Sequence, residues 1–166
     1  MNHGRAVLAS AAMLSLVPGA TARAADRIAD PLNFFEGRTE SVSTIKVMMK
    51  KPVKSRSIGR GKLLPDHSLD LVQHVEEEGK PPHDRRWKIR RVAPGRYAGT
   101  MSDAVGPVTI EETPKGYRFR FKLDGHLSVE QWLTPIGGGS AARSMITVRK
   151  YGLAIAKSEG TIRKLN

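Results

Sequence analysis

The chain has 166 residues, no cysteine, and 28 lysines and arginines against 16 aspartates and glutamates, which gives a formal net charge of +12 at pH 7. The length suits one domain with a hydrophobic core, and the lack of cysteine excludes disulfides, zinc–thiolate centres and thiol nucleophiles. The positive charge favours anionic partners such as phospholipid headgroups, lipopolysaccharide, acidic polysaccharide or nucleic acid, although a solvated basic surface without a specific partner fits it as well.

The first 24 residues have the features of a secretory signal peptide. Arg5 gives a short basic start, residues 6–17 form an apolar run, and residues 22–24 (ARA) give the small-x-small pattern of a cleavage site. The run is shorter than the roughly 20 residues that a membrane-spanning helix needs. We therefore expect cleavage after Ala24, a single domain over residues 25–166, and a periplasmic or secreted protein without a lipid anchor. Export makes nucleic acid the least expected partner.

Beyond the signal, residues 26–34 are predicted to be a short lead-in. In the remaining chain, apolar and polar residues alternate with a period of two. The clearest segment is residues 117–123 (YRFRFKL), in which aromatic or apolar residues alternate with cations, so one face is predicted to be buried and the other wet. Turn signals flank it at residues 113–116 (TPKG) and 124–125 (DG).

Short strands recur along the whole chain at a spacing of roughly ten residues. In chain order they are predicted over residues 39–49, 57–64, 69–75, 86–90, 97–103, 105–112, 117–123, 127–133, 144–150 and 153–164. Residues 153–157 also fit a helical turn. The pattern predicts an all-β fold, a barrel or a sandwich. Short turns favour an antiparallel up-and-down β-barrel of eight to ten strands, which also removes exposed sheet edges.

Several short motifs occur in a recognisable order, namely NFFEG at 33–37, YAGT at 97–100, SDAVG at 102–106, VRKYGLAIA at 148–156 and IRK at 162–164. With them the chain resembles a bacterial family of exported proteins and lipoproteins, domain of unknown function 3833, expected to form lipocalin-like (calycin-like) β-barrels. The resemblance implies the barrel and carries no catalytic residue, because the family has no established activity. The chain lacks the lipoprotein cysteine, and its basic, proline-rich segment 50–84 does not match.

The sequence gives no signature of a catalytic centre, a metal site or a cofactor. His67 and His74 fall on opposite faces of a predicted strand, and no His-x-His or HExxH spacing occurs. The glycine-rich loop at 137–140 lacks the lysine of a phosphate loop, and the glutamates at 76–78 fit a solvated hairpin end. An enzyme using Asp103, His67 or His126 is the least favoured alternative, and we expect neither catalysis nor a cofactor.

Aromatic residues are concentrated in the predicted strands, where they either fill a core or line a cavity. We expect the interior to bind a small apolar or amphipathic ligand through Trp87, Tyr97, Met101, Tyr117, Phe119 and Phe121. Trp132 shares a face with Glu130 and is expected outside or at the barrel mouth. The alternative is an envelope interaction or structural module with a filled core, which docks onto a protein or polysaccharide through a basic face.

Cations alternate with these aromatics and are predicted to form a basic outer wall. The wall comprises Arg85, Arg86, Lys88, Arg90, Arg91, Arg118, Arg120 and Lys122, of which Arg86, Arg90, Arg118 and Arg120 are the expected binding surface. A second basic region lies near the first hairpin and comprises Lys46, Lys50, Lys51, Lys54, Arg56, Arg60 and Lys62. Such surfaces bind an anionic membrane or polysaccharide at low ionic strength and release it in salt.

Overall fold

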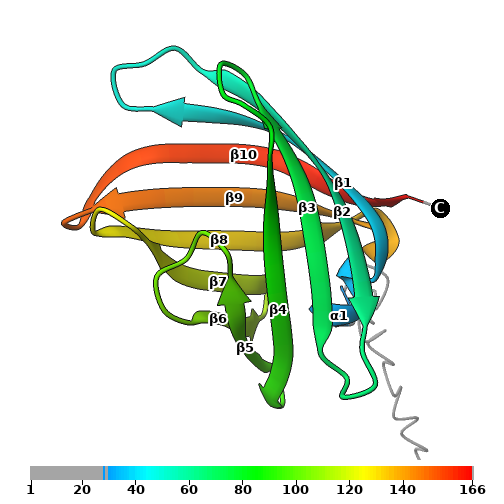
Figure 1. Cartoon of the computed structure of the whole chain (residues 1–166). Coiled ribbons are helices and arrows are strands. Elements are labelled where there is room, and N and C mark those ends of the chain that lie inside the picture. Colours follow the sequence, from blue (N-terminus) through cyan, green and yellow to red (C-terminus); the bar gives the residue numbers. More distant parts are fainter. Residues whose placement is uncertain (1–27, 29, 166) are drawn as a thin grey trace, which may run out of the picture.

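The computed structural model describes Ile28 and residues 30–165, so the predicted signal peptide lies outside the described residues. Ten antiparallel strands form a closed barrel, and one short helix precedes them (Figure 1). The elements are α1 (Pro31–Phe35), β1 (Gly37–Val47), β2 (Val53–Leu63), β3 (Leu69–Glu77), β4 (His83–Ala93), β5 (Arg96–Met101), β6 (Val108–Thr113), β7 (Gly116–Leu123), β8 (Leu127–Ile136), the 3₁₀ turn η2 (Gly137–Gly139), β9 (Ala141–Lys150) and β10 (Leu153–Leu165).

Each strand pairs with its neighbours in the chain, and the first strand pairs with the last. Arg38 lies opposite Leu165 and Val47 opposite Ala156, so β1 and β10 close the ring. The predicted antiparallel up-and-down barrel is therefore confirmed, with ten strands. The segment that also fitted a helical turn is the strand β10, with one register shift between Ala154 and Ala156.

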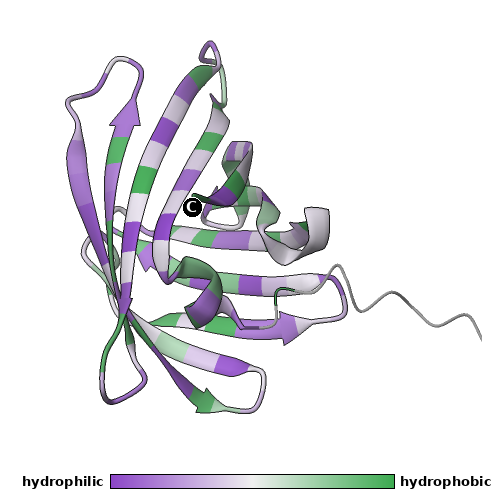
Figure 2. Ribbon diagram, turned by 90° about the vertical axis from the view of Figure 1, so that its right-hand side faces the viewer, coloured by the Kyte–Doolittle hydropathy of each residue, from purple (hydrophilic) through white to green (hydrophobic). Residues whose placement is uncertain are grey.

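The period of two in the sequence becomes an inside and an outside in the barrel. Figure 2 shows hydrophilic and hydrophobic residues alternating along the strands. On β7, Tyr117 and Phe119 are buried, whereas Arg120 is exposed. On β4, Trp87 and Ile89 are buried between exposed cations. Alternate side chains of a strand point to opposite faces of a sheet, so the apolar set of each strand faces the barrel interior.

One end of the barrel is closed by helix α1, which the sequence pattern did not predict. The side chain of Asp30 caps the helix by accepting a hydrogen bond from the Leu32 amide at 2.8 Å, and Pro31 occupies the first turn, where its missing N–H costs nothing. The lead-in expected over residues 26–34 thus contains most of this helix, which precedes the first strand. A helix of five residues is too short to show a helical period. Gly61 lets it approach β2, because a Cβ there would overlap the Phe35 carbonyl oxygen.

The main hydrophobic core lies at this closed end, which we call the floor. Leu69, Ile110 and Leu133 are almost fully buried there. The rings of Tyr97 and Tyr117 meet edge to face with centroids 6.2 Å apart. The Tyr117 hydroxyl donates a hydrogen bond to the Ile28 carbonyl oxygen at 3.2 Å, which ties Ile28 to the barrel.

Three details of the sequence analysis are corrected by the structure. Arg85 and Arg91 do not belong to the outer wall, because odd-numbered residues of β4 share the inward face of Trp87. Arg85 lines the interior, and Arg91 lies at the floor, bonded to Asp30 and the Tyr97 hydroxyl. His67 lies in the turn between β2 and β3 rather than on a strand.

In the part of the chain that the structure describes, no helix has the length and apolarity needed to cross a membrane.

Candidate functional site

The half of the barrel opposite the floor is hollow. It encloses a cavity of about 240 Å³, lined by residues from β1 to β5 and from β7 to β10. The opening lies at the end where β1 joins β2 and β9 joins β10, away from α1 (Figure 1). An engineered apolar cavity of about 150 Å³ is enough to hold benzene. The barrel therefore has room for one small molecule, as ligand-binding barrels of similar strand number do.

One wall of the cavity is apolar and includes three aromatic rings, those of Trp87, Phe119 and Phe121. It comprises Leu71, Val75, Trp87, Ile89, Met101, Phe119, Phe121, Leu123, Val129, Ile146 and Val148. Trp87 and Phe121 meet edge to face with ring centroids 5.8 Å apart. Phe121 is only half-buried, unlike Phe119 below it, so its ring borders the empty space. This wall suits the apolar body of a ligand.

The facing wall consists mainly of serines. Ser41 and Ser43 on β1, Ser55 and Ser57 on β2, and Ser158 on β10 all line the cavity. These three strands are consecutive neighbours in the ring, and the residues lie in register, with Ser41 opposite Ser57 and Ser43 opposite Ser55. Serine is too small to fill the barrel, and its hydroxyl both donates and accepts hydrogen bonds. The serines therefore create the cavity and make one side of it polar.

Two glutamines add polar groups between the walls. The Trp87 indole N–H donates to Gln73 Oε1 at 2.7 Å, and Gln131 Nε2 donates to Ser144 Oγ at 2.9 Å. Both glutamines line the cavity and are half-buried. The first bond satisfies the buried indole nitrogen and fixes the Trp87 ring, as a buried polar group requires.

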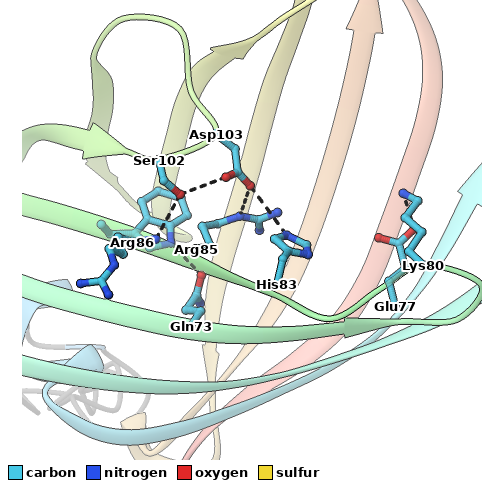
Figure 3. A network of polar contacts seen from close by, with 9 residues as sticks. Gln73, Glu77, Lys80, His83, Arg85, Arg86, Ser102 and Asp103 are labelled. Atoms are coloured by element: carbon cyan, nitrogen blue, oxygen red, sulfur yellow. Dashed lines mark hydrogen bonds and ion pairs between the residues drawn. The ribbon is translucent and has the colours of Figure 1, made fainter.

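Charged residues lie at the upper edge of the cavity, and Figure 3 shows their contacts. Arg85 Nε donates to Asp103 Oδ2 at 2.9 Å, and Asp103 Oδ1 accepts a bond from Ser102 Oγ at 2.9 Å. Glu77 is paired with Lys80 at 2.7 Å. Burial of Asp103 raises its pKa, but the bonds from Arg85 and Ser102 outweigh this effect, and the net pKa is lowered. Asp103 is thus held as a carboxylate that positions Arg85.

The six residues predicted to form a ligand site fall into two groups. Trp87, Met101, Phe119 and Phe121 line the cavity. Tyr97 and Tyr117 face inward but lie in the floor, where the structure packs them against each other and Ile28. Burial raises the pKa of both tyrosines, most strongly that of Tyr117.

The sequence analysis missed the serines, both glutamines, Glu77 and Arg85 as cavity residues. The period of two, counted from Trp87 and from Leu71, places Arg85, Gln73 and Glu77 on the inward face, whereas the serines of β1 and β2 lie on strands without such a reference residue. Because these side chains are polar, the sequence pattern did not identify them as inward-facing, since polar residues of a strand are ordinarily assigned to the solvent-exposed face.

The arginines expected to form a basic binding surface do face outward, but some are neutralised there. Arg118 and Arg120 both bind Glu111, at 2.7 and 2.6 Å. The Arg118 guanidinium also lies 5.5 Å from the ring centre of Trp132, whose indole N–H donates to Glu130. Trp132 is therefore outside, one of the two places expected for it. Arg86 and Arg90 on β4 are exposed.

The residues considered for catalysis are divided between the two ends of the barrel. His67 lies in the turn between β2 and β3 at the floor end, whereas Asp103 and His126 lie in loops at the open end. His126 stacks on Tyr151 with ring centroids 5.7 Å apart. Within the described residues, no group of three or more histidine, aspartate or glutamate side chains is arranged to hold a metal ion.

Comparison with solved structures supports the fold. The S-type phycobiliprotein lyase CPES from Guillardia theta superimposes with a TM-score of 0.64 at 7% identity, over 81% of this chain and 90% of that chain. The redesigned β-barrel mFAP0 bound to DFHBI gives a TM-score of 0.45 at 12% identity, over 79% of this chain and 99% of that one. No family model matches the sequence, and no curated protein matches it. The chain is thus similar in architecture to the phycobiliprotein lyase, and the resemblance to the exported bacterial family stays a prediction.

Proposed function

We propose that this protein binds one small amphipathic molecule inside the barrel. The observation that carries the proposal is the cavity of about 240 Å³ with an apolar wall facing a wall of serines. A purely apolar ligand would leave five serine hydroxyls without hydrogen-bond partners. A fully polar ligand would place polar groups against the rings of Trp87 and Phe121. A molecule with an apolar body and a hydrogen-bonding edge satisfies both walls.

The proposal rests on the cavity and not on what similar structures bind. At 7% identity the likeness to the phycobiliprotein lyase supports the barrel alone. A role in binding without catalysis is part of the proposal, because Asp103 is engaged by Arg85 and Ser102 and lies far along the barrel from His67. Export to the periplasm or beyond is also proposed, on the signal-like features of the first 24 residues.

The direct test is native mass spectrometry of the chain purified from its own host, followed by solvent extraction of any bound molecule. A co-purifying small molecule in one-to-one ratio is the expected result, and its chemistry names the ligand class. A fluorescence titration with anilinonaphthalene sulfonate measures the cavity independently, because this probe combines an aromatic body with an anionic edge.

Two aromatic substitutions provide a matched comparison. Phe121→Ala removes a ring from the cavity wall and is expected to alter probe and ligand binding. Trp132→Ala removes a ring from the outer surface and is expected to leave both unchanged. A ligand-free mass together with no probe binding would contradict the proposal and favour the alternative, a module that docks through its outer surface.

A further inference from the structure

Two neighbouring hairpins at the open end carry exposed apolar residues at their tips. The β1–β2 turn presents Met48 and Met49, and the β9–β10 turn presents Tyr151 and Leu153. Met49 is fully exposed, and 80% of Tyr151 is exposed. The two hairpins are neighbours, since the Met48 amide donates to the carbonyl oxygen of Ile155 on β10 at 2.8 Å. Both project from the barrel end that lies opposite α1 (Figure 1).

The backbone at these tips makes the residue choice unusual. Met49 has φ of 61° and Tyr151 has φ of 50°, in the left-handed region where a side chain other than Gly, Asn or Asp is disfavoured. Turn positions of this kind are ordinarily filled by small polar residues or glycine. A methionine and a tyrosine at such positions add backbone strain and also expose apolar surface to water. Exposed apolar surface of this kind marks a contact with an apolar partner, which the isolated barrel does not provide.

Cations surround the apolar tips. They are Lys46, Lys50, Lys51 and Lys54 from the β1–β2 hairpin, and Arg149, Lys150 and Lys157 from β9–β10. The sequence holds no acidic residue between Glu40 and Asp66 or between Glu130 and Glu159. Lys46 lies directly opposite Lys157 across β1 and β10. Like charges so placed repel each other, and an anionic partner would relieve that repulsion.

In the part of the chain that the structure describes, the acidic residues bordering this surface pair with only one of these cations, Arg149, which lies 4.0 Å from Glu130. Glu78 accepts a bond from the Lys54 backbone amide at 3.2 Å, and Asp124 lies in the turn beside His126. Among the described residues, no ion pair engages the lysines of the two hairpins. On the barrel wall, by contrast, Arg118 and Arg120 share Glu111. Among the described residues, cations without an ion pair thus lie both on the β4 wall, at Arg86 and Arg90, and around the hairpin tips, where exposed apolar residues accompany them at the entrance of the cavity.

From these observations we propose that the tips of the β1–β2 and β9–β10 hairpins dock onto the surface of an anionic phospholipid bilayer. Methionine, leucine and tyrosine enter the interfacial layer, where tyrosine is favoured, and the lysines contact the headgroups. This geometry turns the mouth of the cavity toward the membrane. The proposal goes beyond ligand binding and stands even if the cavity holds no molecule.

Co-sedimentation of the full chain with vesicles tests the surface. We expect binding to vesicles of equal parts phosphatidylglycerol and phosphatidylcholine, loss of binding in high salt, and little binding to pure phosphatidylcholine. Lys50→Glu combined with Lys51→Glu should weaken the partition by more than about tenfold. The matched control, Arg86→Glu combined with Arg90→Glu, makes the same charge change on the wall and should weaken it far less. Equal losses in both double variants, or no binding by the natural chain, would overturn the proposal.

A site-specific label gives a second measurement that does not depend on charge. Because the chain has no cysteine, Met49→Cys can carry a single environment-sensitive fluorophore, and Val92→Cys can carry the same label on an exposed apolar position of β4 at the floor end. Addition of anionic vesicles should shift the emission at position 49 to the blue and leave position 92 unchanged. A shift at both positions, or at neither, would contradict docking through the hairpin tips. The labelled Met49→Cys and Val92→Cys proteins are also titrated with anilinonaphthalene sulfonate. If the cavity still binds this probe, a failure to dock onto vesicles contradicts the membrane proposal and leaves the ligand proposal intact.

Discussion

At the floor of the barrel Leu69, Ile110 and Leu133 are almost fully buried and helix α1 closes the opening, whereas toward the mouth the same strands surround empty space. Both halves obey the same alternation of inward and outward residues. They differ in what occupies the inward positions, which are large side chains at the floor and, on β1, β2 and β10, serines in the hollow half. Strand pairing thus defines the barrel, while side-chain volume at inward positions decides which half is solid and which can accept a ligand.

The two halves should differ most in the free energy of unfolding that is lost when a leucine in each is replaced by alanine. Leu133→Ala at the floor removes a side chain that is almost fully buried and should lower the free energy of unfolding by about 2–5 kcal/mol. Leu123→Ala at the cavity wall removes a half-buried one that already borders empty space, and should cost about 1 kcal/mol or less. Urea denaturation of both variants measures the two costs. Equal costs would mean that the upper half is as tightly packed as the floor.

Adding a larger side chain in the hollow half should raise the free energy of unfolding rather than lower it. Ser57→Val adds apolar volume inside the cavity and should raise the free energy of unfolding by about 0.5–2 kcal/mol while reducing probe binding. Ser128→Val, on the exposed face of β8, is the control and should change neither. A Ser57→Val protein that is less stable, yet binds the probe as before, would show that the serine hydroxyls are needed for the fold.

The floor should also be the part of the molecule that is sensitive to alkali. Burial raises the Tyr117 pKa, so the folded state keeps this proton at a pH where the unfolded chain, with an ordinary tyrosine pKa of about 10, releases it. The stability from the neutral hydroxyl is complete below pH 10 and is lost as the pH rises further. Urea midpoints between pH 8 and 11 should therefore fall more steeply for the natural protein than for Tyr117→Phe. Parallel curves would exclude this contribution.

The smallest effect is expected where β1 meets β10 on the outside. Glu40 accepts bonds from Arg56 at 2.9 Å and from Arg163 at 3.1 Å, which link β2, β1 and β10. The bond from Arg56 is the main cause of its lowered pKa. Exposed ion pairs contribute little, so Glu40→Gln should shift the thermal midpoint only slightly at low salt and not at all at high salt. A large shift would mean that ring closure depends on this pair.

The sequence predicted the strands well because their signal is local. In residues 117–123 every second residue is apolar, and this alternation alone specifies a strand with one buried face. Ring closure by β1 and β10 depends on residues more than a hundred positions apart, and it was predicted only through the general advantage of a barrel without edges.

The candidate site was only partly predictable, because charge and polarity were given more weight than position along the strand. Arg85 was placed outside although it lies two residues before Trp87 and therefore shares its face. The serines of β1 and β2 gave no local signal of direction, since Val42 on the other face of β1 is the more apolar residue and is exposed. Tyr97 and Tyr117 face inward as expected, but their depth along the barrel depends on helix α1, which is too short for the sequence to reveal.

The pairing of β1 with β10 has a consequence for the order of events when the chain is made. A sheet that grows hairpin by hairpin keeps an unpaired edge on β1 until the last strand, Leu153–Leu165, is complete. Until then the serines of β1 and β2 and the apolar wall lie in one open sheet, which encloses no cavity. The cavity is therefore the final product of folding. A chain that stops before β10 has two free sheet edges, which can pair with other chains and begin aggregation.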